Sequence, residues 1–504
     1  MNNYSYHGAW CSYVYPETNS LSTTDDIVEE FGITDISRGC FKKSGIPLFV
    51  SGGQAVLNNE TESTIIFGET GSKKTRSVIA PLMALTAGAG ESAFVTDVKG
   101  ELSSNPKLQK FLREKGVRTV HLDFRGFKGD GYNILEPAFN LYRSGAKDKA
   151  VTMVTKIINS LSERQKNASN DPFWEMSARQ YLIPVIELIF DCCSRHERYA
   201  GMVNMCTLSA FADSSAANLI SSMIDSHIIT ADGRENLYNT LRTVVKNPER
   251  TLACIMSTVQ SVIQEFTMNT ELMYMLSATT FSLDSMYERP TFVFLIVPDE
   301  TSAYDSIAGM LIDIFYTRLI EVYSERYQNK AEARCRINYI CDEFCNLQIN
   351  DMKAKISASR SRNMRWFLVC QSKKQLEIAY PDSASTIIGN CKNTLFLQSS
   401  DIDMLEYISN LCGTTSVTRA SFEEPLVTVD MLKSLRKEHA FKEALFIREN
   451  IKYFTRLPDI DTYDFLKACA AKEAFVFQNR CPQKIHSLTP QKFYDITDSP
   501  RFVV

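Results

Sequence analysis

Short apolar runs alternate with stretches of helical periodicity over most of the chain after Thr64. A short apolar run predicts a buried strand, whereas apolar residues three and four positions apart predict a helix. This alternation is typical of an α/β domain with a mostly parallel sheet. The predicted strands are STIIFG (63–68), SAFVTD (92–97), RTVHLD (118–123), TFVFLIVP (291–298), RINYICDE (336–343), RWFLVCQ (365–371), NTLFLQ (393–398) and ALFIRE (444–449).

Residues 141–286 interrupt this alternation, because they hold helical patterns and few candidate strands. Apolar residues from Val151 to Leu161 have helical spacing, and Asp171 with Pro172 favours the start of a further helix. We expect this block to be an all-α domain inserted into the α/β domain. An elaborated helical face of the same sheet is the alternative.

The predicted organisation of the whole chain follows from this interruption. The α/β domain takes residues 61–140 and 287–480, on either side of the inserted domain 141–286. Residues 1–60 are rich in small polar residues and predict an irregular segment with short strands. Residues 481–504 form a C-terminal tail.

The net charge and the cysteine spacing exclude two classes of protein. The 55 Lys and Arg residues against 59 Asp and Glu residues give a net charge of −4, which excludes a basic protein that coats DNA. Contact with nucleic acid must therefore come from a local patch. The 14 cysteines contain no CxxC pair, which argues against a zinc site and favours free thiols in a reducing compartment.

No segment of the sequence resembles a signal peptide or a membrane span. The longest apolar runs, TFVFLIV (291–297) and LIPVIELIF (182–190), are shorter than the roughly 20 residues that a spanning helix needs. We therefore expect a cytoplasmic chain without a transmembrane helix.

The most informative stretch is GETGSKKT (68–75), which follows a predicted strand and precedes a helical pattern. It fits the phosphate-loop pattern GxxxxGK[ST], in which backbone N–H groups surround the phosphates of a nucleotide. Lys74 would reach the β- and γ-phosphates of ATP, and the Thr75 hydroxyl would bind Mg²⁺. A strand–helix turn that binds nothing is the alternative. The candidate ATP-binding residues are Gly68, Glu69, Thr70, Gly71, Ser72, Lys73, Lys74 and Thr75.

Lys73 departs from this pattern, because a glycine is expected just before the lysine of such a loop. A side chain there costs roughly 1–2 kcal/mol if the backbone angle φ is positive. It also adds a second cation beside the phosphates. We therefore expect ATP binding and hydrolysis to be weakened rather than abolished, and the change Lys73→Gly to improve them.

Polar side chains follow three of the predicted strands. RINYICDEF ends in Asp342, which would hold Mg²⁺ through water, and Glu343, which would act as general base on the attacking water. Gln371 is the last residue of the predicted strand 365–371 and could sense the γ-phosphate, and Asp97 is the last residue of the predicted strand 92–97. The carboxyl ends of parallel strands meet at one edge, where ligands of α/β sheets bind. Turn formation or capping is the alternative for Gln371 and Asp97.

Five cationic residues lie between Glu343 and Gln371. Either Arg360 or Arg362 could be an arginine finger that acts in trans on a neighbouring subunit. A cationic stripe facing a polyanion and a solvated helix face are the alternatives. The five residues are Lys353, Lys355, Arg360, Arg362 and Arg365.

In this order, the motifs resemble those of the coupling ATPases of type IV secretion and bacterial conjugation, the TraG/TraD-type family. The resemblance spans residues 45–460 collinearly. The matching segments are DVKGEL (97–102), YNILEP (132–137), DPFWEMSARQYL (171–182), CDEFCNL (341–347), RSRN (360–363), QSKKQLEIAYP (371–381), GNCKNTLFLQSSDIDMLEYISNLCGTTSV (389–417) and PLVTVDMLKSL (425–435).

The resemblance implies a RecA-like P-loop NTPase domain with an inserted all-α domain. It also implies homo-hexameric rings with ATP and Mg²⁺ at the subunit interfaces; a monomer is the alternative for the isolated chain. The family's site carries over onto Lys74 and Thr75 for phosphate and Mg²⁺. It carries over onto Asp342 and Glu343 for Mg²⁺ and hydrolysis, and onto Gln371 as sensor. Many family members begin with membrane-spanning helices, and this sequence shows none. We therefore expect it to reach the cytoplasmic face of the membrane through a partner; membership of the soluble subset of the family is the alternative.

Three functions remain open at this point. The first is an ATP-dependent coupling protein that recruits and translocates conjugative DNA, with its relaxase, or a protein substrate into a type IV secretion channel. Its partners would be single-stranded DNA or relaxase, and channel components. The second is a docking adaptor that binds nucleotide but hydrolyses it weakly, which Lys73 favours. The third is a DNA-translocating motor for segregation or packaging, against which the segments DPFW and QSKKQL argue.

Overall fold

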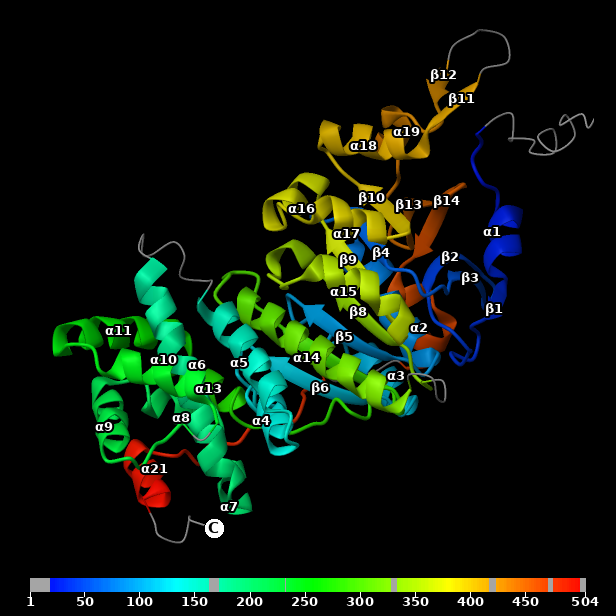
Figure 1. The fold of residues 1–504 in the computed structure, drawn as a ribbon. Coiled ribbons are helices and arrows are strands. Elements are labelled where there is room, and N and C mark those ends of the chain that lie inside the picture. Colours follow the sequence, from blue (N-terminus) through cyan, green and yellow to red (C-terminus); the bar gives the residue numbers. More distant parts are fainter. Residues whose placement is uncertain are drawn as a thin grey trace, which may run out of the picture.

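The computed structural model describes residues 19–162, 172–231, 233–327, 333–416, 423–469 and 475–498. Two lobes are visible, a larger one built around a sheet and a smaller one built from helices (Figure 1). The helix expected to start at Asp171 and Pro172 begins at Pro172, and Asp171 lies outside the described residues.

A nine-stranded sheet forms the centre of the larger lobe. Seven strands are parallel, and the last two at one edge, β13 and β14, are antiparallel. The predicted mostly parallel α/β sheet is therefore confirmed. In spatial order the strands are β14 (Ile451–Pro458), β13 (Phe441–Arg448), β10 (Asn393–Gln398), β4 (Thr64–Gly68), β9 (Met364–Cys370), β8 (Ile337–Cys341), β5 (Ser92–Asp97), β7 (Thr291–Ile296) and β6 (Arg118–Asp123).

The inner strands are buried on both faces, because helices cover both sides of a parallel sheet. Along β4, Ile65 and Phe67 belong to the core on one face, and Ile66 belongs to the core on the other. The first face is covered by α14 (Asp305–Arg326), α15 (Met352–Ser359), α16 (Lys373–Ala379), α17 (Ala384–Asn390) and α18 (Ile402–Cys412). The second face is covered by α2 (Ala80–Gly88), α3 (Pro106–Glu114) and α20 (Asp464–Lys467).

The N-terminal segment packs against the second face through a small antiparallel sheet of order β1-β3-β2. The sequence predicts irregular structure with short strands here, and the structure adds a helix, α1. These elements are α1 (Thr24–Phe31), β1 (Ile33–Asp35), β2 (Ile46–Ser51) and β3 (Gln54–Asn58). The remaining short elements of the larger lobe are η1 (Lys74–Ile79), η3 (Phe344–Asn346), η4 (Arg360–Arg362), β11 (Thr414–Ser416), β12 (Glu423–Pro425), α19 (Val429–Lys433) and η5 (Ile460–Thr462).

The smaller lobe lies in the sequence between β6 and β7 and is built from helices. Its long central helix, α6, packs against α5, α10 and α11. The helices are α4 (Glu136–Arg143), α5 (Lys147–Ser162), α6 (Pro172–Ser194), α7 (Glu197–Ala200), α8 (Met205–Ala210), α9 (Ser214–Asp225), α10 (Glu235–Val245), α11 (Glu249–Val262), α12 (Gln264–Met268) and α13 (Thr270–Met275).

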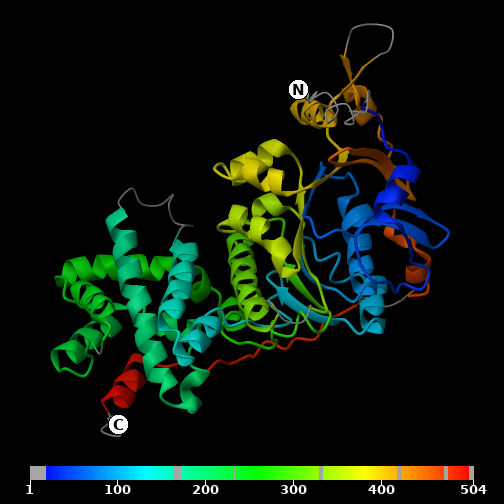
Figure 2. The same cartoon turned by 45° about the vertical axis from the view of Figure 1, so that its right-hand side comes forward.

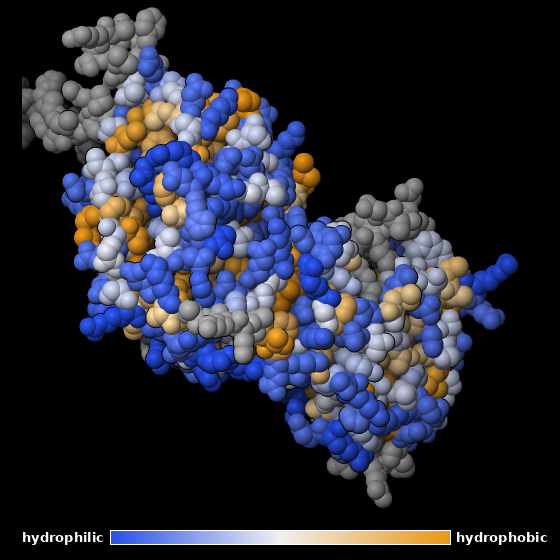
Figure 3. Space-filling model, turned by 180° about the vertical axis from the view of Figure 1, so that it is seen from behind, coloured by the Kyte–Doolittle hydropathy of each residue, from blue (hydrophilic) through white to orange (hydrophobic). Residues whose placement is uncertain are grey.

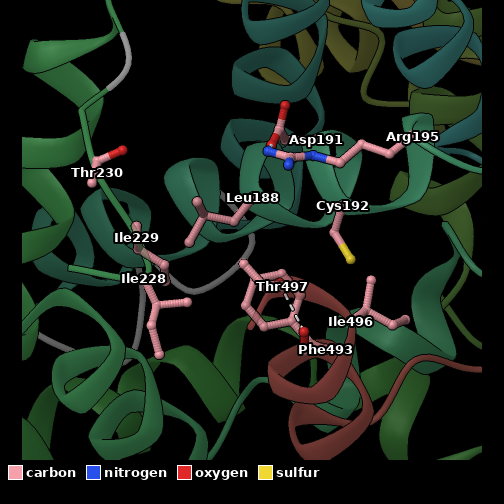
Figure 4. A pocket seen from close by; sticks show the side chains of 10 residues that line it. All are labelled: Leu188, Asp191, Cys192, Arg195, Ile228, Ile229, Thr230, Phe493, Ile496 and Thr497. Atoms are coloured by element: carbon pink, nitrogen blue, oxygen red, sulfur yellow. Dashed lines mark hydrogen bonds and ion pairs between the residues drawn. The ribbon is translucent and has the colours of Figure 1, made fainter. Parts of the chain in front are cut away.

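The C-terminal tail crosses from the edge of the sheet to the smaller lobe (Figure 2). The backbone N–H of Cys481 donates to the Gly129 carbonyl at 2.8 Å, and further on the N–H of Leu488 donates to the Thr207 hydroxyl at 2.9 Å. The tail ends in helix α21 (Pro490–Thr497), which packs on α6 and α9. Between α6, residues 228–230 and α21 lies a cavity of about 50 Å³ (Figure 4).

The face of the molecule seen in Figure 3 is mostly hydrophilic, with apolar residues scattered over it. Within the described ranges, no helix combines the length and the apolar character needed to cross a membrane.

A buried ionic cluster joins the N-terminal segment to the starts of three strands of the main sheet. Glu91, just before β5, lies 2.7 Å from Arg336 and 3.5 Å from Arg365. Asn338 and the Ser44 hydroxyl donate to the same carboxylate at 3.0 and 2.7 Å. Burial by itself raises the pKa of Glu91, but the two guanidinium groups outweigh it and lower the pKa to about 2.

We expect the change Glu91→Gln to lower the free energy of unfolding by about 3–5 kcal/mol at pH 7, because it leaves two buried guanidinium groups without their counter-ion. The folded pKa, about 2, lies below the ordinary value of 4.5. The contribution of Glu91 is therefore present above pH 4.5 and lost as the pH falls towards 2. Urea unfolding at pH 7 and at pH 3 should show the larger difference at pH 7. The exposed Glu197→Gln is the matched control, and an equal loss in both variants would contradict the assignment.

Candidate nucleotide-binding site

The loop after β4 has the backbone of a phosphate-binding loop. Gly71 and Lys73 have positive φ angles of 80° and 65°, and the helix η1 begins at Lys74. A Cβ atom on Gly68 would lie 2.6 Å from the Ser72 hydroxyl, so that a side chain at this position would displace that hydroxyl. That hydroxyl is buried and has no hydrogen-bond partner. The loop is therefore tightly folded and keeps one buried polar atom unsatisfied.

The Lys74 side chain connects this loop to the end of a neighbouring strand. Its ammonium donates to the carbonyl of Gly68 at 2.7 Å and lies 3.7 Å from a carboxylate oxygen of Glu343. The residue is buried, so that the ammonium lies inside the site rather than in solvent. Thr75 follows it in the first turn of η1 and is half-buried.

The two acids that end β8 have different environments. Asp342 is buried; its burial and the adjacent Glu343 carboxylate outweigh Lys74 and raise the pKa of Asp342 to about 7. Its carboxylate accepts a hydrogen bond from the backbone N–H of Glu343 at 3.1 Å. Glu343 has a positive φ of 49°, which turns the chain sharply at the strand end. A buried acid next to a half-buried one is suited to bind a divalent cation.

Gln371 completes the group of side chains. Its amide nitrogen donates to a carboxylate oxygen of Glu343 at 3.1 Å. Lys74, Gln371 and Glu343 follow β4, β9 and β8 in the chain. These three strands are adjacent in the sheet, so that their carboxyl ends meet at one edge. The structure thus brings together Lys74, Glu343 and Gln371, with Asp342 beside them.

The Lys73 ammonium binds a distant segment of the chain, which the sequence does not predict. Its ammonium donates to the backbone carbonyls of Glu438 and His439 at 2.6 and 2.9 Å and lies 3.5 Å from the Asp459 carboxylate. It is therefore bound to a different part of the chain rather than left as a second cation for the phosphates. The positive φ is present as anticipated and carries the cost of roughly 1–2 kcal/mol, which these contacts can offset.

Asp97 forms a turn at the end of β5. Its carboxylate accepts hydrogen bonds from the backbone N–H groups of Leu102 and Ser103 at 3.3 and 2.7 Å. Burial, more than these bonds, determines the direction of its pKa, which is raised. The turn-forming alternative accounts for this residue.

The basic residues between Glu343 and Gln371 fall into two groups. Lys355 and Arg365 are buried and bound to Asp313 and Glu91, so that neither forms part of a cationic surface. The alternative of a cationic stripe, and that of a solvated helix face, do not hold for these two, because each is buried with an acidic partner distant in sequence.

Arg360 and Arg362 lie at the start of β9, whereas Gln371 follows its end. Arg360 is exposed and lies 3.4 Å from Glu62, which precedes β4. Seven residues of strand separate the two edges by about 20 Å. Neither arginine is therefore brought to the Lys74 site within one chain.

Sequence reasoning missed the residues that support the phosphate loop from outside. Arg76 binds Asp459 through two hydrogen bonds, at 2.6 and 2.9 Å. Lys437 donates to the Gly71 carbonyl. The only sequence signal for these residues is a group of acids after the run 451–458, which has no recognisable connection to the loop.

Comparison with known proteins finds similarity to proteins of conjugative DNA transfer, both for the sequence and for the fold. A family model described as "Type IV secretory system Conjugative DNA transfer" matches residues 23–447. The bacterial conjugative coupling protein TrwBdeltaN70, in a trigonal form with sulphate, is 14% identical, with a TM-score of 0.57 over 92% of this chain and 95% of that chain. The plasmid coupling protein TrwB in complex with ADP and Mg²⁺ is 15% identical, with a TM-score of 0.56 over 92% and 95%. TrwB has also been solved with the ATP analogue ADPNP (14% identity, TM-score 0.57, 93% and 97%). At these identities the likeness shows the fold. No curated protein sequence matches this chain.

Proposed function

This chain belongs to the type IV secretory system family of conjugative DNA transfer, and on that premise we propose that it is an ATP-driven coupling protein. It recruits conjugative DNA, with its relaxase, and moves it into a type IV secretion channel. The observation that carries the proposal is the contact of Lys74 and Gln371 with the two oxygens of Glu343 at one sheet edge.

The residues present fit a nucleotide with Mg²⁺. The buried Ser72 hydroxyl lacks a hydrogen-bond partner, and the buried Lys74 supplies a cation for the phosphates. Thr75 and Asp342 supply oxygen ligands of the kind that Mg²⁺ prefers. TrwB binds ADP and Mg²⁺ according to its solved complex, and we extend this to the present chain.

In the proposed reaction, each side chain has one task. Lys74 leaves the Gly68 carbonyl to bind the β- and γ-phosphates, and Thr75 and Asp342 hold Mg²⁺. When bound, Mg²⁺ neutralises charge on the phosphate oxygens. Glu343 takes a proton from the attacking water, and Gln371 orients the Glu343 carboxylate through its amide.

The position of the arginines supports assembly of several subunits. Because Arg360 and Arg362 lie at the opposite edge from the Lys74 site of their own chain, a finger would have to come from a neighbouring subunit. We propose a homo-hexameric ring with ATP between subunits, six being the number that the resemblance to the coupling ATPases implies. Contact with the membrane would come through a partner protein.

The proposal is tested by ATP hydrolysis of the purified chain with and without single-stranded DNA. We expect hydrolysis that rises severalfold with DNA and is lost in Lys74→Ala, because the phosphates lose their cation. Lys467→Ala, at an exposed side chain of α20, is the control and should behave as the unchanged chain. Nucleotide binding without hydrolysis would instead support the docking adaptor.

A further inference from the structure

Two loops face each other at the carboxyl edge of the sheet. One is the phosphate loop 68–75; the other is the turn 435–440 that leads into β13. Strand β13 is antiparallel to β10, and β10 is parallel to β4. The start of β13 therefore lies at the same edge as the end of β4. Neither the family pattern nor the motifs of the sequence assign a role to this turn.

Each of the two loops has a lysine whose ammonium donates a hydrogen bond to the backbone of the other. Lys73 of the phosphate loop donates to the carbonyls of Glu438 and His439 at 2.6 and 2.9 Å. In the opposite direction, Lys437 of the turn donates to the carbonyl of Gly71. Each ammonium thus binds the backbone of the other loop. We call this pair of side chains, with their carbonyl acceptors, the lysine clasp.

A buried carboxylate anchors the clasp. Asp459 is 2% exposed and lies 3.5 Å from the Lys73 ammonium. It also binds Arg76 through two hydrogen bonds, at 2.6 and 2.9 Å. Arg76 and Lys73 stand on either side of Lys74 and Thr75 in the sequence. One acid after β14 therefore holds both ends of the segment that carries the catalytic lysine.

We propose that Lys73 and Lys437 are positioning residues for nucleotide binding, which act by fixing the backbone of residues 71–74. Without the clasp, a non-glycine residue at φ 65° would relax towards an ordinary conformation and turn Lys74 and the loop N–H groups away from the phosphates. Lys73, although it stands where a glycine is expected, thus stabilises the conformation of the loop. This inference rests on the proposed function, because it concerns the same ATP site.

The first test is binding of the fluorescent analogue mant-ATP with Mg²⁺. Lys73→Met and Lys437→Met should each raise the dissociation constant about tenfold, since each removes a charged donor that orders the loop. The double variant should fall short of the product of the two effects, because the lysines support one structure. Lys437→Arg, which can still donate, should restore binding. The rate at saturating ATP should change less than the dissociation constant.

The second test needs no nucleotide. In the ligand-free chain, amide hydrogen exchange over residues 69–76 should accelerate in Lys73→Met and in Lys437→Met. Lys433→Met, on the exposed end of α19, is the matched control and should leave exchange unchanged. Circular dichroism and urea midpoints establish that the variants are folded.

Two outcomes overturn the inference. If Lys73→Gly binds mant-ATP more tightly than the unchanged chain, relief of the backbone strain outweighs the clasp. If both methionine variants leave exchange over 69–76 unchanged, the clasp does not order the loop. Failure of the proposed function looks different: the unchanged chain would bind no nucleotide, whereas the exchange experiment would still decide the role of the clasp.

Discussion

Replacing Glu343 by glutamine should leave ATP binding nearly unchanged and slow hydrolysis by about 10²- to 10⁴-fold, the contribution of a general base. The carboxylate lies at the centre of the site, with Lys74 at 3.7 Å on one oxygen and Gln371 at 3.1 Å on the other. A glutamine keeps an oxygen that can accept the hydrogen bond of Gln371. It cannot take up a proton from water, so that only the chemical step is lost.

Release of inorganic phosphate and binding of mant-ATP, measured on the same preparation, separate the two effects. Glu197→Gln, an exposed change in the smaller lobe, should leave both unchanged. Undiminished hydrolysis in Glu343→Gln would show that another group activates the water. A parallel loss of binding would show that the carboxylate acts by holding the metal or Lys74 instead.

Removal of the arginine finger should lower hydrolysis by about 10³- to 10⁵-fold in the assembled ring. Arg360→Ala and Arg362→Ala are the two variants; Arg360 is the more accessible, with a side chain that is 69% exposed. Both residues lie about 20 Å from the phosphate loop of their own chain along β9. The effect therefore requires a neighbouring subunit and should be absent from the isolated monomer.

Mixing inactive chains tests this directly. A Lys74→Ala chain still presents both arginines, and an arginine variant still has an intact phosphate loop. Mixed rings should recover part of the hydrolysis, because some interfaces combine the two intact halves. Lys353→Ala, on the exposed face of α15, serves as the control for a lost surface charge. No recovery on mixing would mean that neither arginine acts in trans.

The central site could be predicted from sequence because its residues follow strands. A buried apolar run predicts a strand without knowledge of its neighbours, and parallel strands place their ends at one edge. Lys74, Glu343 and Gln371 needed only this rule to be brought together. The same reasoning predicted the three strands that carry them to within a residue or two at most ends. It omitted β14, whose sequence IKYFTRLP mixes charged and apolar residues as an edge strand does.

Residues whose role depends on a distant partner could not be assigned. Arg365 lies in a run of basic residues, which predicts an exposed side chain. In the structure it is buried, with its guanidinium near the Glu91 carboxylate. Lys73 predicts a cation for phosphate, yet its ammonium binds carbonyls 365 and 366 positions away. The tail predicts no partner, yet α21 packs on α6.

By itself, the sequence determined the parallel α/β sheet, the phosphate loop and the acids at the end of β8. These features follow from local periodicity and from short-range spacing, which the chain carries whatever its surroundings. The tertiary structure alone decided which charged side chains remain available. A lysine or arginine is equally suited to solvent, a carboxylate, a backbone carbonyl or a phosphate, and the choice depends on what the fold places within about 3 Å of its nitrogen atoms. For Lys73, the fold placed the 435–440 turn there, and the ammonium binds the carbonyls of Glu438 and His439.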